Sequence, residues 1–177
     1  ILKKIKKKIY KNSSEKIIFG ENYNYRKSKN GFTYKDDLGK INLPLPNLAG
    51  DFQISNISTA IATARKLEQF KITNFHVKKA ITNIRSEGRL QSITRGKLRK
   101  YVSKHNKILI DGAHNPLAAT AIEKYLGTLN SGRKIIMLLG MMANKEHKKF
   151  IQIFRNRVHS IIALNIPNQL NFIEKDK

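Results

Sequence analysis

Apolar residues recur at helical spacing in the middle of the chain. The segment SNISTAIATARKLEQF, residues 55–70, carries them three or four positions apart, which predicts an amphipathic helix with one buried face. Ser55 or Asn56 stands where the cap of this helix is expected. The residues predicted to face the core are Ile57, Ala60, Ile61, Ala64 and Leu67.

The next segment, NFHVKKAITNI at residues 74–84, repeats this pattern. Asn74 would cap a second helix, and the two helices would form a hairpin. The polar sequence RSEGRLQ at residues 85–91 predicts a loop after the hairpin. The buried stripe of the second helix would consist of Val77, Ala80, Ile81 and Ile84.

From about residue 98 onward, the pattern alternates between short apolar strands and amphipathic helices. One helix is predicted from Pro116, with Asn115 as its cap, to about Leu129. A second helix is predicted over residues 145–158, with Phe150, Ile151, Phe154 and Val158 facing inward. The predicted strands are KILID (107–111), KIIMLLG (134–140) and HSIIALNIP (159–167). Strands separated by helices of this length predict a parallel sheet with right-handed crossovers.

The patterns together predict an α/β protein with three segments. Residues 1–50 are expected to be β-rich or irregular, because KIIFG, GFTYKDD and GKINLPLP are interrupted by glycine and proline. Residues 51–90 would form the helical hairpin and a hinge. Residues 91–177 would form a Rossmann-like, mostly parallel sheet with flanking helices. A doubly wound sheet normally has more than these three strands, so this last domain is expected to be incomplete.

The formal net charge of +23 has two interpretations. Clustered lysine and arginine would favour a polyanion partner, such as a nucleic acid. A coding bias is the other explanation, because the chain contains 26 Lys, 24 Ile and 17 Asn, the residues that an AT-rich genome over-uses. Outside residues 3–8 the lysines are scattered, and no basic stripe interleaved with aromatic residues occurs. Binding to nucleic acid is therefore not favoured.

Cysteine content and hydropathy exclude further classes. The chain has no cysteine, which excludes disulfides and thiolate metal sites and fits a reducing, cytoplasmic environment. No run of about 18 apolar residues occurs, so no membrane span is predicted. The first residue is Ile1 rather than methionine, which suggests a fragment of a longer protein.

The turn DGAHNP, residues 111–116, gathers polar side chains between a predicted strand and a predicted helix. Ligands of α/β proteins bind at the carboxyl ends of strands, where Asp111 stands, and the N–H groups of a helix that begins after Asn115 favour anions. A structural interpretation stays open, in which Asp111 and Asn115 are turn and cap residues and His114 is a surface histidine.

Two further positions have the same two interpretations. Asn56 follows the glycine-containing segment LAGDFQ and can be a helix cap or a ligand contact. Arg89 follows a glycine in a loop, where a guanidinium can pair with phosphate or carboxylate. Arg89 can equally be a basic residue without a binding role, since the chain contains 35 lysines and arginines.

Four motifs, taken in order, resemble the folylpolyglutamate synthase and dihydrofolate synthase family of the Mur ligase superfamily: LPNLAGDFQISNISTAIA, GRLQ, ILIDGAHNPLAA and GMMANKE. The resemblance covers roughly residues 40–166. It implies a ligase that activates a carboxylate of dihydropteroate or folate as an acyl phosphate, using ATP and Mg²⁺, before the amine of L-glutamate attacks. Residues 1–50 would then be a remnant of the central ATPase domain and residues 91–177 a Mur ligase C-terminal domain.

The resemblance also implies roles for five residues. Asn56 matches the asparagine of the G-x-H-Q-x-x-N motif beside the nucleotide, and Arg89 matches the arginine of the GR hinge that reaches the ATP phosphates. Asp111 would lie on the nucleotide side, and His114 would lie close to nucleotide and substrate as the catalytic candidate. Lys145 matches the lysine after the glycine of the next strand and would also contact the nucleotide.

The sequence departs from the family pattern at several points. Phe52 stands in place of the motif histidine, and Glu146 replaces an aspartate. No G-x-x-G-K-[ST] phosphate-binding loop occurs, and the ligands of Mg²⁺ are expected outside this chain. We therefore expect half of an ATP site, which would be inactive without a separate N-terminal half. The alternatives are a non-functional remnant of a split gene and, less favoured, a basic nucleic-acid-binding module.

Overall fold

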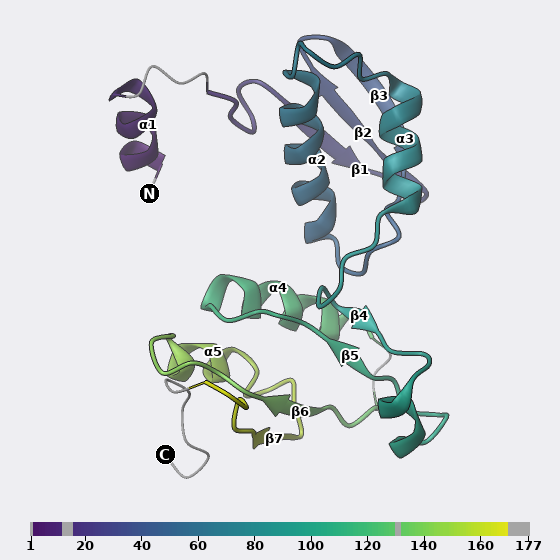
Figure 1. Cartoon of the computed structure of the whole chain (residues 1–177), viewed down its shortest axis with the longest axis vertical. Coiled ribbons are helices and arrows are strands. Elements are labelled where there is room, and N and C mark those ends of the chain that lie inside the picture. Colours follow the sequence, from purple (N-terminus) through teal and green to yellow (C-terminus); the bar gives the residue numbers. More distant parts are fainter. Residues whose placement is uncertain (1, 12–15, 130–131, 170–177) are drawn as a thin grey trace. The chain divides into compact units, whose positions relative to one another are not determined.

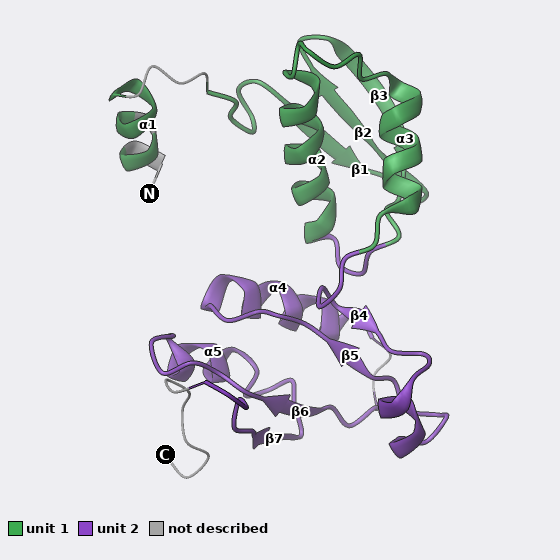
Figure 2. Ribbon diagram, viewed as in Figure 1, with its two compact units in different colours: residues 1–47, 52–85 green, residues 48–51, 86–177 purple. Residues whose placement is uncertain are grey.

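The chain folds into helices and strands that form two compact units (Figure 2). In this computed structural model, residues 2–11, 16–129 and 132–169 are described. Unit 1 comprises residues 1–47 and 52–85, and unit 2 comprises residues 48–51 and 86–177. The fold class is α/β, as predicted. In the described part of the chain, no helix has the length and apolar character needed to cross a membrane.

Unit 1 is built on a three-stranded antiparallel sheet of order β1-β2-β3 (Figure 1). The strands are β1 (Asn24–Lys27), β2 (Gly31–Asp36) and β3 (Gly39–Pro44). Alternate residues of β2 and β3 are buried, because α2 (Phe52–Arg65) packs on β1 and β2 and α3 (Asn74–Asn83) packs on β3. The buried side chains of this sheet face are Phe32, Tyr34, Ile41 and Leu43.

The strands GFTYKDD and GKINLPLP are confirmed, but the expectation for KIIFG is wrong. KIIFG forms no strand, and its Phe19 makes only an isolated bridge to Tyr23. The strand β1 lies instead in NYNYRKSKNG, a sequence that its asparagines and lysines assign to a loop. Pairing with β2 overrides that local preference. A basic helix, α1 (Leu2–Lys11), also forms where none was predicted.

The predicted helical hairpin is present, with corrected ends. Helix α2 begins at Phe52, so Ser55 and Asn56 lie inside the helix and do not cap it. The buried stripe is accordingly shifted to Ile54, Ile57, Ile61 and Ala62, whereas the predicted core residues Ala60 and Leu67 are exposed. The cap of α3 is Thr73 rather than Asn74, because the Thr73 hydroxyl accepts from the backbone N–H of His76.

Tyr34 makes unit 1 sensitive to alkaline pH. Its side chain is fully buried and its hydroxyl donates to Asp36 Oδ2 at 3.1 Å. Burial, followed by the charge of Asp36, raises the pKa of this hydroxyl above its ordinary value. The folded chain therefore holds this proton more tightly than the unfolded chain does, and this contribution to stability is lost as the pH rises above about 10, where the unfolded tyrosine ionises.

We expect the free energy of unfolding of the wild-type chain to fall more steeply above about pH 10 than that of the variant Tyr34→Phe, which has no proton to lose at this position. Urea denaturation followed by circular dichroism, at a series of pH values on both sides of this point, measures the two slopes. Parallel slopes for the two proteins would contradict the assignment.

Unit 2 contains one parallel and one antiparallel pair of strands. β6 (Ile136–Leu139) and β7 (Ser160–Ala163) are parallel, and α5 (His147–Ile153) connects them. The strand predicted at residues 107–111 is shortened to β5 (Leu109–Ile110) and pairs antiparallel with β4 (Gln91–Ser92). The prediction that it joins the parallel sheet is therefore wrong for the described residues, because β4, which directly follows the predicted hinge, pairs with it instead. A 3-10 helix, η1 (Lys97–Tyr101), lies between β4 and β5.

Helix α4 (Pro116–Gly127) begins as predicted, with Asn115 Oδ1 accepting from the backbone N–H of Ala118 at 2.9 Å. Phe150 and Phe154 point into the core as predicted. Ile151 lies within α5 but is exposed, so it faces away from this core. The buried core of unit 2 consists of Ala119, Leu126, Met141, Phe150 and Phe154.

Candidate functional site

The carboxyl ends of three strands meet at one cavity in unit 2. Asp111 directly follows β5, Gly140 directly follows β6, and Ile166 lies three residues after β7. All three line a cavity of about 330 Å³. His114 and Lys145 line the same cavity, so three of the five predicted site residues are brought together. This is the position at which α/β proteins bind ligands.

The carboxylate of Asp111 accepts hydrogen bonds from two different turns. Its Oδ1 accepts from the backbone N–H of Ala113 and its Oδ2 accepts from the backbone N–H of Leu90, both at 2.8 Å. The resemblance places Asp111 on the nucleotide side. In the structure each oxygen already has one backbone donor, so each oxygen has a single remaining lone-pair direction for a ligand. The structural and the ligand-binding interpretations of Asp111 are thus compatible.

Arg89 stands in the turn that Asp111 holds. The backbone N–H of Gly112 donates to the carbonyl oxygen of Gly88 at 2.8 Å, and Leu90 donates to Asp111, so both neighbours of Arg89 are bonded to the DGAHNP turn. Gly88 and Leu90 both have positive φ, of 63° and 45°. The Arg89 side chain is exposed and forms no hydrogen bond or ion pair with the described residues. A guanidinium in this situation is available to a phosphate or carboxylate.

His114 and Lys145 present one imidazole and one ammonium group at the cavity. His114 Nδ1 lies 3.0 Å from the carbonyl oxygen of Gly112, so Nδ1 carries the proton and donates. Its Nε2 is then left for a ligand. The Lys145 side chain is half-buried, and its ammonium group makes no hydrogen bond or ion pair within the described part of the chain. An unpaired ammonium in a partly enclosed site favours an anion.

Asn56 lies in unit 1, on α2, and the structure does not test its predicted place beside the others. Its side chain is exposed, and its Nδ2 donates to Gln53 Oε1 at 3.1 Å. Gln53 is buried, and its Nε2 has no hydrogen-bond partner among the described residues. Residues three positions apart on a helix are neighbours on its surface, which accounts for this contact.

Sequence reasoning missed the apolar lining of the cavity. Met141 and Met142 follow the strand-ending Gly140, and Ile166 approaches from the segment after β7. A methyl group at position 140 would lie 3.0 Å from Ile166 Cγ1, so a larger residue there would require the Ile166 side chain to move. The glycine at the end of an apolar strand was the signal that could have indicated these neighbours.

The described residues do not fit a metal centre. No group of three or more His, Asp or Glu side chains within residues 2–11, 16–129 and 132–169 is arranged to hold a metal ion. A single carboxylate with two backbone donors, as Asp111 is, does not provide the several oxygen ligands that Mg²⁺ requires.

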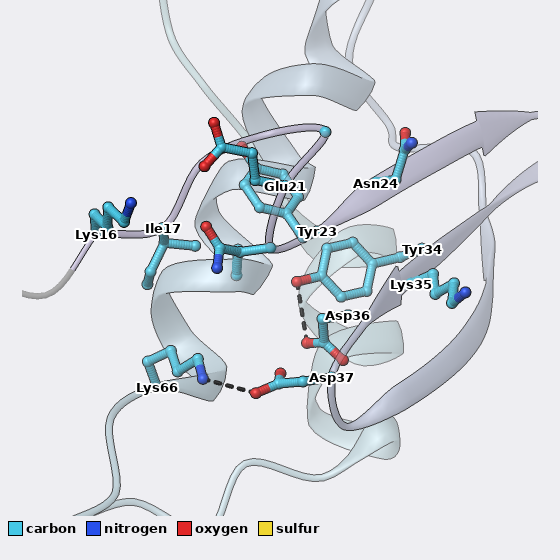
Figure 3. A pocket seen from close by; sticks show the side chains of 13 residues that line it. Lys16, Ile17, Glu21, Tyr23, Asn24, Tyr34, Lys35, Asp36, Asp37 and Lys66 are labelled. Atoms are coloured by element: carbon cyan, nitrogen blue, oxygen red, sulfur yellow. Dashed lines mark hydrogen bonds and ion pairs between the residues drawn. The ribbon is translucent and has the colours of Figure 1, made fainter. Parts of the chain in front are cut away.

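A second cavity, of about 470 Å³, lies in unit 1 (Figure 3). Its acidic side chains include Asp36, which is bonded to Arg65 and Tyr34, and Asp37, which pairs with Lys66 at 2.9 Å. None of the five predicted site residues lines this cavity. We therefore take the smaller cavity at the strand ends as the candidate site.

Comparison with known proteins identifies relatives of the segment that contains this cavity. Residues 88–173 match the family model described as Mur ligase, glutamate ligase domain. This segment is similar to that domain. This matched segment contains all residues that line the cavity, from Asp111 to Ile166. The chain is 29% identical over 106 residues to the dihydrofolate synthase/folylpolyglutamate synthase of Buchnera aphidicola and 29% identical over 149 residues to the folylpolyglutamate synthase of Lacticaseibacillus casei. These matches cover 60% and 79% of the chain.

The fold of the chain is also found in solved structures. A bifunctional folylpolyglutamate synthase/dihydrofolate synthase with Mn, AMPPNP and L-glutamate bound superimposes with a TM-score of 0.80, at 18% identity, over 98% of this chain and 39% of that one. The two relatives named above are covered over 23% and 32% of their own lengths. The chain therefore spans about a quarter to a third of those relatives.

Proposed function

We propose that this chain forms the C-terminal wall of the active site of an ATP-dependent ligase, which adds L-glutamate to dihydropteroate or folate through an acyl phosphate. The supporting observation is the cavity that combines Asp111, His114 and Lys145 at the strand ends, in a domain of the Mur ligase glutamate ligase family. The reaction must hold a triphosphate, a carboxylate and a transferred phosphoryl group together, so it needs cationic and hydrogen-bonding groups at such a position.

In this proposal, each side chain acts on a negative or polar group. Arg89 pairs with phosphate oxygens of ATP, because its guanidinium has no partner in its own turn. Lys145 balances the charge of the nucleotide, and Asp111 accepts from the ribose through its remaining lone pairs. His114 is the catalytic candidate, since its Nε2 can accept or donate a proton beside nucleotide and substrate. Asn56 contacts the nucleotide from α2.

The remaining parts of the reaction are assigned to other protein segments. The sequence has no G-x-x-G-K-[ST] loop, so the β- and γ-phosphates and Mg²⁺ would be held by a phosphate-binding half on another segment or on a separate chain. We propose that the present chain is inactive until this half is supplied. When bound, Mg²⁺ would neutralise phosphate charge.

A chimaera tests the proposal. The matched segment of the Lacticaseibacillus casei folylpolyglutamate synthase is replaced by this chain, and glutamate-dependent formation of ADP from ATP is measured with folate or dihydropteroate as acceptor. We expect activity from the chimaera and none from this chain alone. Within the chimaera, His114→Ala and Lys145→Ala should each lower turnover, by about 10²-fold or more for the histidine.

Matched controls are His105→Ala and Lys148→Ala, which alter an exposed histidine and an exposed lysine outside the cavity. Both should keep the activity of the unmodified chimaera. A chimaera that folds with native circular dichroism but forms no ADP would contradict the proposal, and so would equal losses from the cavity variants and the controls.

A further inference from the structure

The turn that carries Arg89 contains a backbone conformation that leucine rarely adopts. Leu90 has a φ of 45°, in the left-handed region, and its side chain is only 3% exposed, so the core holds this residue in place. Gly88, on the other side of Arg89, also has a positive φ, of 63°. Such conformations cost free energy, persist where the surrounding structure fixes them, and cluster at ligand-binding positions. The turn at residues 88–91 is therefore a candidate for a segment whose order serves the site.

The side chain of Gln91 closes this turn. Its Oε1 accepts a hydrogen bond from the backbone N–H of Gly88 at 3.0 Å, and this bond joins the first and last residues of the segment 88–91. Gln91 is itself placed by β4, in which it pairs with Ile110 of β5. The acceptor thus stands on a strand, and Arg89 lies within the ring that the hydrogen bond closes.

Two hydrogen bonds from the DGAHNP turn hold the same segment. The backbone N–H of Gly112 donates to the carbonyl oxygen of Gly88, and the N–H of Leu90 donates to Asp111 Oδ2, both at 2.8 Å. Asp111 also lines the cavity, so a substitution of Asp111 would change the turn and the cavity together. Gln91 is not among the residues that line the cavity. The Gln91 hydrogen bond can therefore be removed without altering a cavity-lining side chain.

A neutral acceptor suits position 91. The amide oxygen of glutamine accepts the Gly88 N–H without adding charge. A glutamate at this position would accept the same hydrogen bond, but its carboxylate would stand two residues from Arg89 and would compete with a phosphate for the guanidinium. Gln91 therefore orders the turn without placing an anion beside Arg89.

We propose that Gln91 is a positioning residue for Arg89. Its amide oxygen fixes the backbone from which the arginine side chain extends, so less conformational freedom is lost when the guanidinium pairs with phosphate. The phosphate contact rests on the proposed function, whereas the ordering of the turn by Gln91 does not.

Hydrogen exchange of the full chain, followed by NMR, tests the ordering of the turn. Gln91→Met keeps the length of the side chain but removes the amide oxygen, and Gln91→Glu keeps an acceptor oxygen. We expect the Gly88 amide to exchange at least about tenfold faster in Gln91→Met and within about twofold of the wild-type rate in Gln91→Glu. The Leu164 amide, which donates to the carbonyl oxygen of Leu139, is the control and should exchange at the same rate in all three proteins.

Titration of the full chain with ADP, followed by NMR chemical shifts, tests the link to Arg89. Arg89→Met should raise the Kd by about tenfold, because one charge-assisted contact is lost. Gln91→Met alone should raise the Kd by about threefold to fivefold. In the Arg89→Met background, Gln91→Met should cause no further rise, since a positioning residue acts only through the group that it positions.

Three results would overturn the proposal. The first is an unchanged exchange rate of the Gly88 amide in Gln91→Met, or an equal acceleration of the Leu164 amide, which would indicate a general loss of stability. The second is an ADP affinity that Arg89→Met lowers and Gln91→Met does not. The third is a loss from Gln91→Met that persists in full in the Arg89→Met background. An ADP affinity that Arg89→Met leaves unchanged would instead contradict the proposed role of Arg89, and the exchange rates would still decide whether Gln91 orders the turn.

Discussion

Replacing Arg65 by alanine is expected to lower the free energy of unfolding by about 3–5 kcal/mol, because it leaves a buried carboxylate without its counter-charge. Arg65 Nε donates to Asp36 Oδ2 at 2.8 Å and Nη2 donates to Oδ1 at 3.2 Å. The two side chains are only 8% and 7% exposed. Arg65 Nη1 also donates to Asn74 Oδ1 at 3.3 Å, so this guanidinium joins the ends of β2 and α2 to the start of α3.

The adjacent ion pair provides the control. Lys66 Nζ donates to Asp37 Oδ2 at 2.9 Å, and this hydrogen bond holds the pKa of the Asp37 carboxyl below its ordinary value. Asp37 is nevertheless exposed, and water screens the interaction. Lys66→Ala should therefore change stability far less than Arg65→Ala, as measured by urea denaturation. Equal losses from the two substitutions would show that burial does not strengthen the Arg65–Asp36 pair.

Phe154→Ala should destabilise unit 2 by a similar amount, about 3–5 kcal/mol, through the cavity that it leaves. The ring is fully buried and lies 5.3 Å from the ring of Phe150, centroid to centroid. It belongs to the core that also holds Ala119, Leu126 and Met141. Because Met141 lines the candidate site, the loss of Phe154 should also weaken any ligand binding measured at the cavity.

Ile151→Ala is the matched comparison, since Ile151 is only three residues away but exposed. Its effect should stay within about 0.5 kcal/mol. Thermal and urea denaturation of both variants, followed by circular dichroism, would separate the two positions. A large loss from Ile151→Ala would instead support the sequence pattern, which predicted that Ile151 faces inward.

Local patterns predicted the elements around the site well. Asn115 caps α4 and Pro116 begins it, because the signals for a helix start involve neighbouring residues only. Phe150 and Phe154 are core residues, as their helical spacing indicates. Asp111 directly follows β5, because an apolar run stops there.

Long-range pairing was not predictable in the same way. The short β5 pairs with β4, some 18 residues earlier, and no local pattern distinguishes this partner from β6. The helix α2 begins at Phe52, directly after Asp51, and aspartate and asparagine are equally good caps by residue type, so residue type alone does not choose between a start at Phe52 and a start after Asn56. Three of the five predicted site residues, Asp111, His114 and Lys145, line one cavity because they follow the ends of β5 and β6. The order of strands and helices along the sequence is enough to suggest this proximity.

The two hydrogen bonds of Asp111 constrain which sequences this part of the fold can accept. Positions 90 and 113 each donate a backbone N–H to the carboxylate, so proline is excluded from both. Leu90 adds a conflict of its own, because its φ of 45° favours glycine whereas its buried side chain favours a large apolar residue. Homologous sequences should therefore conserve the aspartate more strictly than either donor position. At position 90 they should carry either glycine, which adopts a positive φ without strain, or a large apolar residue, which fills the core.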